Sequence, residues 1–266
     1  MVLNQIYYRQ PPAGRRVYFN PAEVEVQHDA AGKRSGARLL GDGLPVEYGG
    51  LGTMSKSKNN GVDPQGLVGK YGADTARLFV LFASPPEQTL EWSDEGVQGQ
   101  FRFLRRLWKA VHEHVTAGPA PARAALAGCT GAAAELRRLT QQTLVRVSDD
   151  IGRRRVFNTA IAAVMELLNA VTRLDDASPS GRAVRQEALE IAVVCLSPMV
   201  PHICHELWRS LGHERALIEE PWPQPDAAAL VQQTVELAVQ VNGKLRAQVR
   251  VAAGAAEATV RAAALA

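Results

Sequence analysis

One short stretch carries the residue types best suited to chemistry in this sequence, Thr53-Met54-Ser55-Lys56-Ser57-Lys58-Asn59-Asn60-Gly61. Three glycines precede it at 49, 50 and 52, and Asp63-Pro64 follows it. Glycines let a backbone turn closely around an anion, while serine hydroxyls and lysine ammonium groups supply donors and charge. The stretch therefore predicts a phosphate-binding loop with Lys56 as its main cation, although a solvated surface loop can have the same composition.

The residue order excludes the Walker phosphate loop, which needs glycine directly before Lys-Ser, because Ser55 stands there. Met54-Ser55-Lys56-Ser57 instead resembles the KMSKS signature of class I aminoacyl-tRNA synthetases, with Thr53 in place of the first lysine. Four further segments are similar to leucyl-tRNA synthetases in particular: Lys58 to Gln65, Tyr71 to Phe79, Ala83 to Pro86 and Thr89 to Ser93.

This resemblance implies ATP-dependent activation of leucine and transfer of the leucyl group to tRNA(Leu), with Mg²⁺ accompanying ATP. Thr53, Met54, Ser55, Lys56 and Ser57 would bind ATP, and Lys56 would be catalytic by meeting charge on the triphosphate. The family's HIGH motif, leucine pocket and editing domain would precede Met1, so we expect the isolated chain to be inactive. A non-catalytic tRNA-binding module and a helical scaffold without an RNA partner are the alternatives.

The bulk composition is that of an ordinary soluble globular protein, with 266 residues, 46% hydrophobic and 21% charged. A net charge of +3 means that any RNA-binding surface must come from local clustering. Three cysteines without a CxxC pair indicate neither a disulfide framework nor a four-sulfur zinc site. We expect no metal site, no signal peptide and no membrane span, which predicts a cytoplasmic protein, and we expect a monomer.

Short strand candidates make residues 1–48 β-rich: Val17 to Phe19, Val24 to Gln27 and Leu44 to Tyr48, with a hairpin turn at Gly41-Asp42-Gly43. By resemblance, this region is a leucine-specific insertion and the end of the catalytic core. Residues 49–95 hold the loop and its supporting helices. Asp63 is a good N-cap, Pro64 suits the first turn, and Gly72 suits the end of the first of these helices.

Residues 96–225 show helical periodicity and predict a bundle. In its first helix, expected from Phe101, an apolar stripe of Leu104, Leu107, Trp108 and Val111 opposes four basic residues, Arg102, Arg105, Arg106 and Lys109. Arg153 and Arg154 stand at a later joint. These six basic residues are candidate contacts to the tRNA backbone, although basic helix faces are also commonly just solvated. The bundle resembles the anticodon-binding helical domain of the leucine, isoleucine, valine and methionine enzymes.

Residues 232–266 alternate on both sides of Asn242-Gly243, which predicts a β-hairpin. By resemblance this is the beginning of an incomplete α+β domain. The predicted fold is therefore mainly α, with a β-rich N-terminal insertion, a helical unit behind the loop, a helix bundle and a C-terminal hairpin.

His202-Ile203-Cys204-His205 is the one other cluster with possible chemistry. It lacks the second histidine of HExxH, and Cys204 replaces the glycine of HIGH. Histidines and cysteines packed in a helix bundle are the preferred interpretation.

Overall fold

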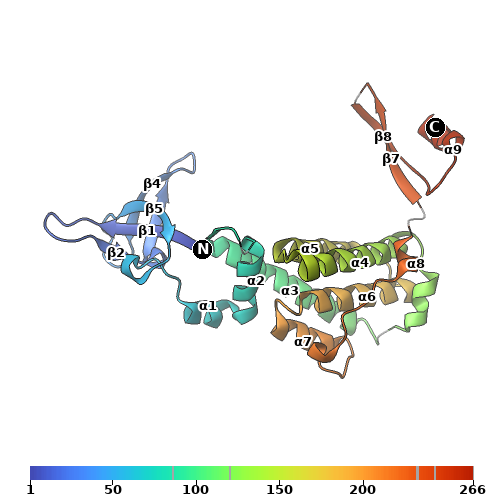
Figure 1. Cartoon of the computed structure of the whole chain (residues 1–266), viewed down its shortest axis with the longest axis horizontal. Helices are drawn as coiled ribbons and strands as arrows, with labels where there is room; N and C mark the ends of the chain where they lie inside the picture. The colour runs from blue at the N-terminus through green and yellow to red at the C-terminus, as the bar shows by residue number, and fades with distance from the viewer. Residues whose placement is uncertain (86, 120, 232–233, 243, 266) are drawn as a thin grey trace.

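The computed structural model describes residues 1–85, 87–119, 121–231, 234–242 and 244–265. The fold is mainly α with small β elements, which confirms the predicted class. Figure 1 shows a β-rich end that holds the N-terminus, then two short helices, then a bundle of longer helices, with a hairpin projecting beyond it. Among the described helices, none combines the length with the apolar composition that crossing a membrane requires.

Some predicted features include residues that the structure does not describe. Pro86 ends one of the segments that carry the resemblance, Gln232 and Gln233 begin the predicted tail region, and Gly243 belongs to the predicted hairpin turn. These four residues lie outside the described part of the chain, as do Ala120 and Ala266.

A sheet near the N-terminus is centred on β1 (Val2–Arg9), which pairs antiparallel with β2 (Val17–Phe19) and β5 (Glu47–Thr53). The short β6 (Leu90–Glu91) adds to β1 in parallel. Strand β1 was not predicted, because Asn4 and Gln5 break its apolar alternation and a bulge interrupts its register after Gln5.

A separate hairpin is formed by β3 (Val24–His28) and β4 (Arg34–Leu39). β4 was also missed, since a strand with arginines and Gly36 reads as a loop. The predicted turn at Asp42-Gly43 exists, with Gly43 at φ 70°, but it leads only to a single bridge between Arg38 and Pro45. The strand predicted at 44–48 is therefore wrong in position, because β5 begins at Glu47.

Two short helices follow the loop, and the first of them matches its predicted caps. α1 (Pro64–Tyr71) starts at Asp63, whose carboxylate accepts from the N–H groups of Gln65 and Gly66 at 3.1 and 2.9 Å. Gly72, at φ 83°, separates it from α2 (Ala73–Ala83). Local cap chemistry thus sets both ends of α1.

The bundle consists mainly of α3 (Asp94–Thr116), α4 (Gly131–Asp149), α5 (Phe157–Arg173), α6 (Pro179–Leu196) and α7 (Pro201–Ser210). The predicted apolar stripes form one continuous core. Its members include Leu144 and Val147 of α4, Ile161, Val164 and Leu168 of α5, Val184 and Cys195 of α6, and Leu207 of α7, all at most 1% exposed.

The start and one face of α3 differ from the prediction. Ser93 caps the helix through the N–H of Gly96 at 3.0 Å, so α3 begins seven residues before Phe101. Gly96 lowers helical propensity but permits close packing, since a Cβ there would lie 2.7 Å from Phe79 Cε2. Trp108 was assigned to the apolar stripe but is 44% exposed, because it sits at the edge of the buried face.

The chain leaves the bundle through α8 (Ala227–Leu230) and reaches the hairpin of β7 (Thr234–Val241) and β8 (Lys244–Ala252). Val241 pairs with Lys244, which confirms the predicted hairpin, and Asn242 has φ 53°. The helix α9 (Glu257–Leu265) packs against β8, which gives the hairpin one covering element.

Candidate functional site

The lysine-rich loop connects β5 to α1 and turns once on itself. Ser55 is extended, Lys56–Lys58 forms a single 3-10 turn, and Asn59 adopts the left-handed conformation at φ 46°. The hydroxyls of Ser55 and Ser57 lie 3.3 Å apart on this turn. Lys56 and Ser57 are exposed, so the turn presents an ammonium and a hydroxyl to solvent.

The two lysines of the turn have different surroundings. A Cβ on Gly52 would lie 3.4 Å from Lys58 Nζ, so this ammonium lies against the end of β5, next to Thr53. Lys58 is half-buried, whereas Lys56 is exposed. In the described part of the chain, neither lysine has a carboxylate within ion-pair distance. Two uncompensated cations in one loop suit an anionic ligand.

Thr53 and Met54, the other two residues expected to bind a nucleotide, occupy the entrance of the loop. Thr53 is exposed, with its hydroxyl 3.0 Å from Met1 Sδ, and Met54 is half-buried. The five predicted nucleotide-binding residues are contiguous in the sequence, from the end of β5 into the 3-10 turn. Asn60 was missed by sequence reasoning, although it is fully buried at the back of this loop.

Polar contacts join the helices behind the loop to the bundle. The Asp74 carboxylate on α2 accepts from the Ile203 N–H at 2.7 Å and lies 2.8 Å from His202 Nδ1. Arg77 donates to the carbonyl oxygens of Met199 and Pro198 at 2.9 and 3.2 Å. Both residues hold the corner between α6 and α7, so α2 is a fixed link between the loop and the bundle.

Aromatic packing reinforces this joint, and the nearby cysteines are buried. Trp92 lies edge-on to Phe79 with ring centroids 5.0 Å apart, in a cluster with residues of β1, α1 and α3. Burial raises the pKa of the Cys195 thiol to about 12 and that of Cys204 well above its ordinary value. Both thiols therefore stay protonated and pack as small apolar groups. Within the described residues, no group of three or more His, Cys, Asp or Glu side chains could hold a metal ion.

The four basic residues of α3 are all exposed but fall into two pairs. Arg106 donates to the side chain of Asn169, and Lys109 lies 3.5 Å from Glu113. Arg102 and Arg105 form no ion pair with any described carboxylate. Arg102 and Arg105 are therefore the cations of α3 most available to a polyanion.

An open groove of about 270 Å³ runs beside Arg105. Its walls come from α1, α2, α3 and α7: Tyr71, Asp74, Thr75, Phe101, Leu104, Arg105, Trp108 and Ile203. The Arg105 guanidinium lies 5.9 Å from the centre of the Phe101 ring. The exposed edge of Trp108 is thus part of a surface that α3 shares with the helices behind the loop.

Arg153 and Arg154 lie at the joint between α4 and α5, where each has an acidic partner. Arg153 contacts both carboxylate oxygens of Asp149, at 2.5 and 2.8 Å, and holds the pKa of Asp149 below its usual value. Arg154 lies 2.6 Å from the buried Asp150. These partners partly neutralise both arginines, which distinguishes them from Arg102 and Arg105.

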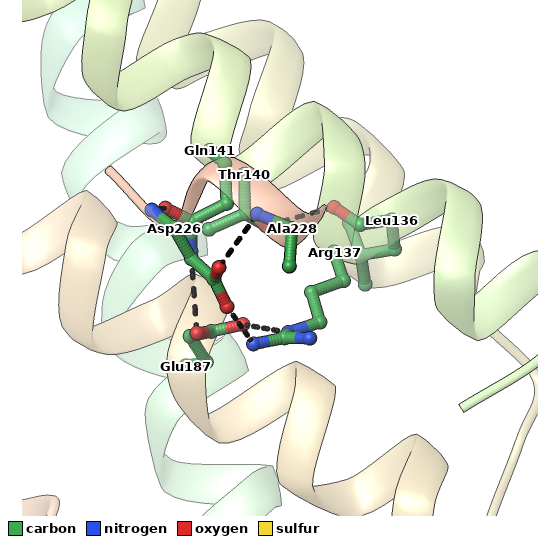
Figure 2. Close-up of polar contacts among 7 residues, drawn as sticks. All are labelled: Leu136, Arg137, Thr140, Gln141, Glu187, Asp226 and Ala228. Atoms are coloured by element: carbon green, nitrogen blue, oxygen red, sulfur yellow. Dashed lines mark hydrogen bonds and ion pairs between the residues drawn. The ribbon is translucent and has the colours of Figure 1, made fainter. Parts of the chain in front are cut away.

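A further polar cluster inside the bundle is structural (Figure 2). Arg137 on α4 donates to Glu187 on α6 at 3.1 Å and to Asp226 at 2.6 Å. Gln141 donates to Glu187 and accepts from the Asp226 N–H. Burial raises the pKa of Glu187, while the backbone N–H of Ala228 lowers that of Asp226. Since every member is paired, the cluster ties the segment leading to the tail onto the bundle.

Comparison with known proteins agrees with this architecture. Residues 38–93 match the family "tRNA synthetases class I (I, L, M and V)", and residues 134–261 match "Anticodon-binding domain of tRNA ligase". The leucine–tRNA ligase of Nitrosospira multiformis is 61% identical over 258 residues, covering 95% of this chain and 29% of that protein. The leucine–tRNA ligase of Nitrosomonas eutropha is 56% identical over 263 residues, covering 98% of this chain and 30% of that protein.

A solved structure has a similar fold. It is a ternary complex of an Agrobacterium radiobacter K84 LeuRS with tRNA and LeuAMS, with a TM-score of 0.67 and 29% sequence identity. The match covers 80% of this chain and 28% of that one. A loop–helix unit followed by a helical bundle is thus the architecture of a class I tRNA synthetase. This chain is similar to leucyl-tRNA synthetases along 95% or more of its own length, spans about 30% of theirs, and corresponds to a C-terminal portion of them.

Proposed function

We propose that this chain is the part of a leucine–tRNA ligase that carries the signature loop and the tRNA-docking bundle. The proposed reaction is ATP-dependent formation of leucyl-adenylate, followed by transfer of the leucyl group to tRNA(Leu). The observation that carries the proposal is the lysine-rich loop, which lies within the segment matched to class I tRNA synthetases and presents cations without acidic partners among the described residues.

Lys56 is the proposed catalytic residue. Negative charge builds up on the leaving pyrophosphate as the leucine carboxylate attacks the α-phosphate, and an exposed ammonium that meets this charge lowers the barrier. Ser55 and Ser57 donate hydrogen bonds to the same phosphate oxygens, while Thr53 and Met54 border the nucleotide. Mg²⁺ is proposed only as a companion of ATP, since the described residues do not fit a metal site, and no step is assigned to it.

The bundle is the proposed docking surface for tRNA. Arg102 and Arg105 supply the available charge on α3, with Arg106 and Lys109 beside them. Arg153 and Arg154 are proposed as secondary contacts, because each would have to share its charge with an aspartate. Contacts to phosphate position an RNA without reading its sequence.

The proposed organisation has four regions: 1–48 as the insertion and end of the catalytic core, 49–95 as loop and support, 96–225 as bundle, and 232–266 as part of a C-terminal domain. The proposed setting is the cytoplasm and the proposed state a monomer. A stand-alone tRNA-binding module is less favoured, because the relatives are ligases.

Leucine-dependent exchange of pyrophosphate with ATP distinguishes the two functions. In a full-length synthetase that contains this segment, the ligase role requires that exchange depend on Lys56. Exchange at an unchanged rate in a Lys56→Ala variant would contradict it.

A further inference from the structure

We propose that Asn60 is a positioning residue that fixes the shape of the lysine-rich loop and so aims Lys56. This inference deepens the proposed function and rests on it for its catalytic consequence. Asn60 is 0% exposed and lies directly behind the turn. It does not need to touch a ligand, because its effect passes through the backbone of Ser55.

The side-chain amide of Asn60 joins the end of the loop to its beginning. Its Oδ1 accepts a hydrogen bond from the Ser55 N–H at 2.8 Å. Its Nδ2 faces three carbonyl oxygens, of Gly52 at 3.2 Å and of Thr53 and Asn4 at 3.4 Å. The amide orientation is chemically determined, because a flipped amide would set N–H against N–H and oxygen against three carbonyls.

A second asparagine, Asn4 on β1, adds to these hydrogen bonds, which together are called the closure of the loop. Asn4 Nδ2 donates to the backbone carbonyl of Asn60 at 3.1 Å, so the two asparagines exchange hydrogen bonds across the sheet edge. Asn4 is 5% exposed. The loop is thereby fastened to the central strand of the sheet and not only to its own ends.

This closure dictates the path of the residues between Ser55 and Asn60. Because Ser55 and Asn60 are joined, the four residues between them must form a compact turn. In this turn the Lys58 N–H donates to the Ser55 carbonyl at 3.3 Å, and the Asn59 N–H donates to the Lys56 carbonyl at 3.2 Å. The turn puts Lys56 on the outside. A loop without the tie would keep its lysines but lose the direction in which Lys56 points.

Only an amide of this length satisfies both sides of the closure. Asn60→Ala removes the acceptor and the donor together. Asn60→Asp keeps an acceptor for the Ser55 N–H but sets a charged oxygen against three carbonyl oxygens. A protonated aspartate regains one donor, so the aspartate variant is a switchable version of the closure.

Hydrogen exchange on the 266-residue chain tests the closure directly. We expect the Ser55 amide to be protected in the parent and to exchange on the order of tenfold faster in Asn60→Ala and, at neutral pH, in Asn60→Asp. In Asn60→Asp alone, the protection factor should rise again as the pH is lowered and the carboxylate takes up a proton. The matched control is Asn59→Gly, which keeps the left-handed turn and should leave the protection of Ser55 unchanged.

Trypsin gives a second readout, since it cuts after Lys56 and Lys58. Both sites should be cleaved on the order of tenfold faster in Asn60→Ala than in Asn59→Gly, while the melting of the helix bundle is the same in both. Unchanged Ser55 protection and unchanged cleavage in folded Asn60→Ala would overturn the proposal. So would a failure of Asn60→Asp to regain protection at low pH.

The catalytic consequence is tested in a full-length synthetase that contains this segment. Asn60→Asp should lower kcat for pyrophosphate exchange with little change in the KM for leucine. Combined with Lys56→Ala it should add little further loss, because Asn60 acts through Lys56. If Lys56→Ala itself has no effect, the proposed function fails. Hydrogen exchange of the Ser55 amide would still test whether Asn60 holds the loop in shape. Full additivity of the two variants would contradict action through Lys56.

Discussion

At the scale of single residues, the two lysines of the loop have different surroundings, and we infer different roles for them. Lys56 points outward, whereas the Lys58 ammonium lies against Gly52, one residue before Thr53. Gly52 permits the close approach of Ile6, whose Cδ1 would lie 2.6 Å from a Cβ at this position, whereas the distance of 3.4 Å to Lys58 Nζ would be an ordinary contact. We infer that Lys58 supplies charge near the position that Thr53 leaves neutral.

This inference predicts a rescue. Lys58→Ala should lower the exchange rate of a full-length synthetase less than Lys56→Ala does, because Lys58 is set back from the exposed side of the turn. Adding Thr53→Lys to Lys58→Ala should restore most of the lost rate, as the new ammonium enters the same neighbourhood. Steady-state exchange assays on the two single variants and the double variant measure this. A double variant no faster than Lys58→Ala would contradict the inference that Lys58 supplies the charge that Thr53 lacks.

A buried histidine makes stability depend on pH. Burial lowers the pKa of His114 from 6.5, and its Nε2 lies 2.6 Å from Gln186 Oε1 while Nδ1 has no partner among the described residues. The folded state therefore keeps this ring neutral. Its contribution is fully present above pH 6.5 and is lost as the pH falls from 6.5 towards the lowered folded pKa.

The free energy of unfolding, measured by denaturant titration between pH 8 and 5, should fall more steeply for the parent than for His114→Gln. The difference cannot exceed about 1.4 kcal/mol per pH unit, the value for one proton. His112→Gln is the matched control, because His112 is exposed on the same helix and should behave like the parent. Parallel curves for the parent and His114→Gln would show that His114 does not titrate as proposed.

At the scale of elements, helix ends set by local residues could be predicted from the sequence, whereas pairing between distant strands could not. The ends of α1 were predicted because Asp63, Pro64 and Gly72 act on their own neighbours. β1 was missed because its pairing partners, β2 and β5, lie 8 or more residues away in sequence and its polar residues serve the loop. Asn60 was missed for the same reason. Its type suggests a turn, and only the backbone of β1 and β5 reveals the closure.

The cluster around Arg137 is an element-scale tie whose strength can be measured. Arg137→Ala would leave Glu187, 7% exposed, without its cation, and we expect a loss of about 2–3 kcal/mol in the free energy of unfolding. Arg153→Ala is the contrasting control, since its ion pair is on the surface and should contribute little. Denaturant unfolding of both variants provides the test. Equal stability of the two would mean that the Arg137 cluster does not fasten the segment to the bundle.

At the scale of the whole molecule, α2 links the lysine-rich loop to the bundle through Asp74 and Arg77. The groove beside Arg105 is lined by residues of α1 and α2, the helices behind the loop, and of α3 and α7 in the bundle. A tRNA docked on α3 would therefore contact a unit that is continuous with the loop. Helical periodicity predicted the bundle and its basic face, but only the packed structure shows which of these arginines lack an acidic partner among the described residues.

Binding of tRNA should depend on Arg102 and Arg105, which form no ion pair with a described carboxylate. Replacing Arg102 and Arg105 by Gln should weaken binding and reduce the slope of log affinity against log salt by about 0.7–0.9 for each lost phosphate contact. The control, Arg153→Gln with Arg154→Gln, should change the slope less, because both arginines already contact aspartates. Titrations across a salt series measure both proteins. An unchanged slope in the Arg102 and Arg105 variant would show that these arginines do not contact tRNA phosphates.

The most direct test of the account is the rate of leucine-dependent pyrophosphate exchange in a full-length synthetase that contains this segment, with Lys56→Ala. Because Lys56 is proposed to meet charge that develops only during adenylate formation, kcat should fall by about 100-fold while the KM for leucine changes little. Lys70→Ala, an exposed lysine on α1, should exchange at the parent's rate. A Lys56→Ala enzyme as fast as the parent, or one changed only in KM, would contradict the central claim.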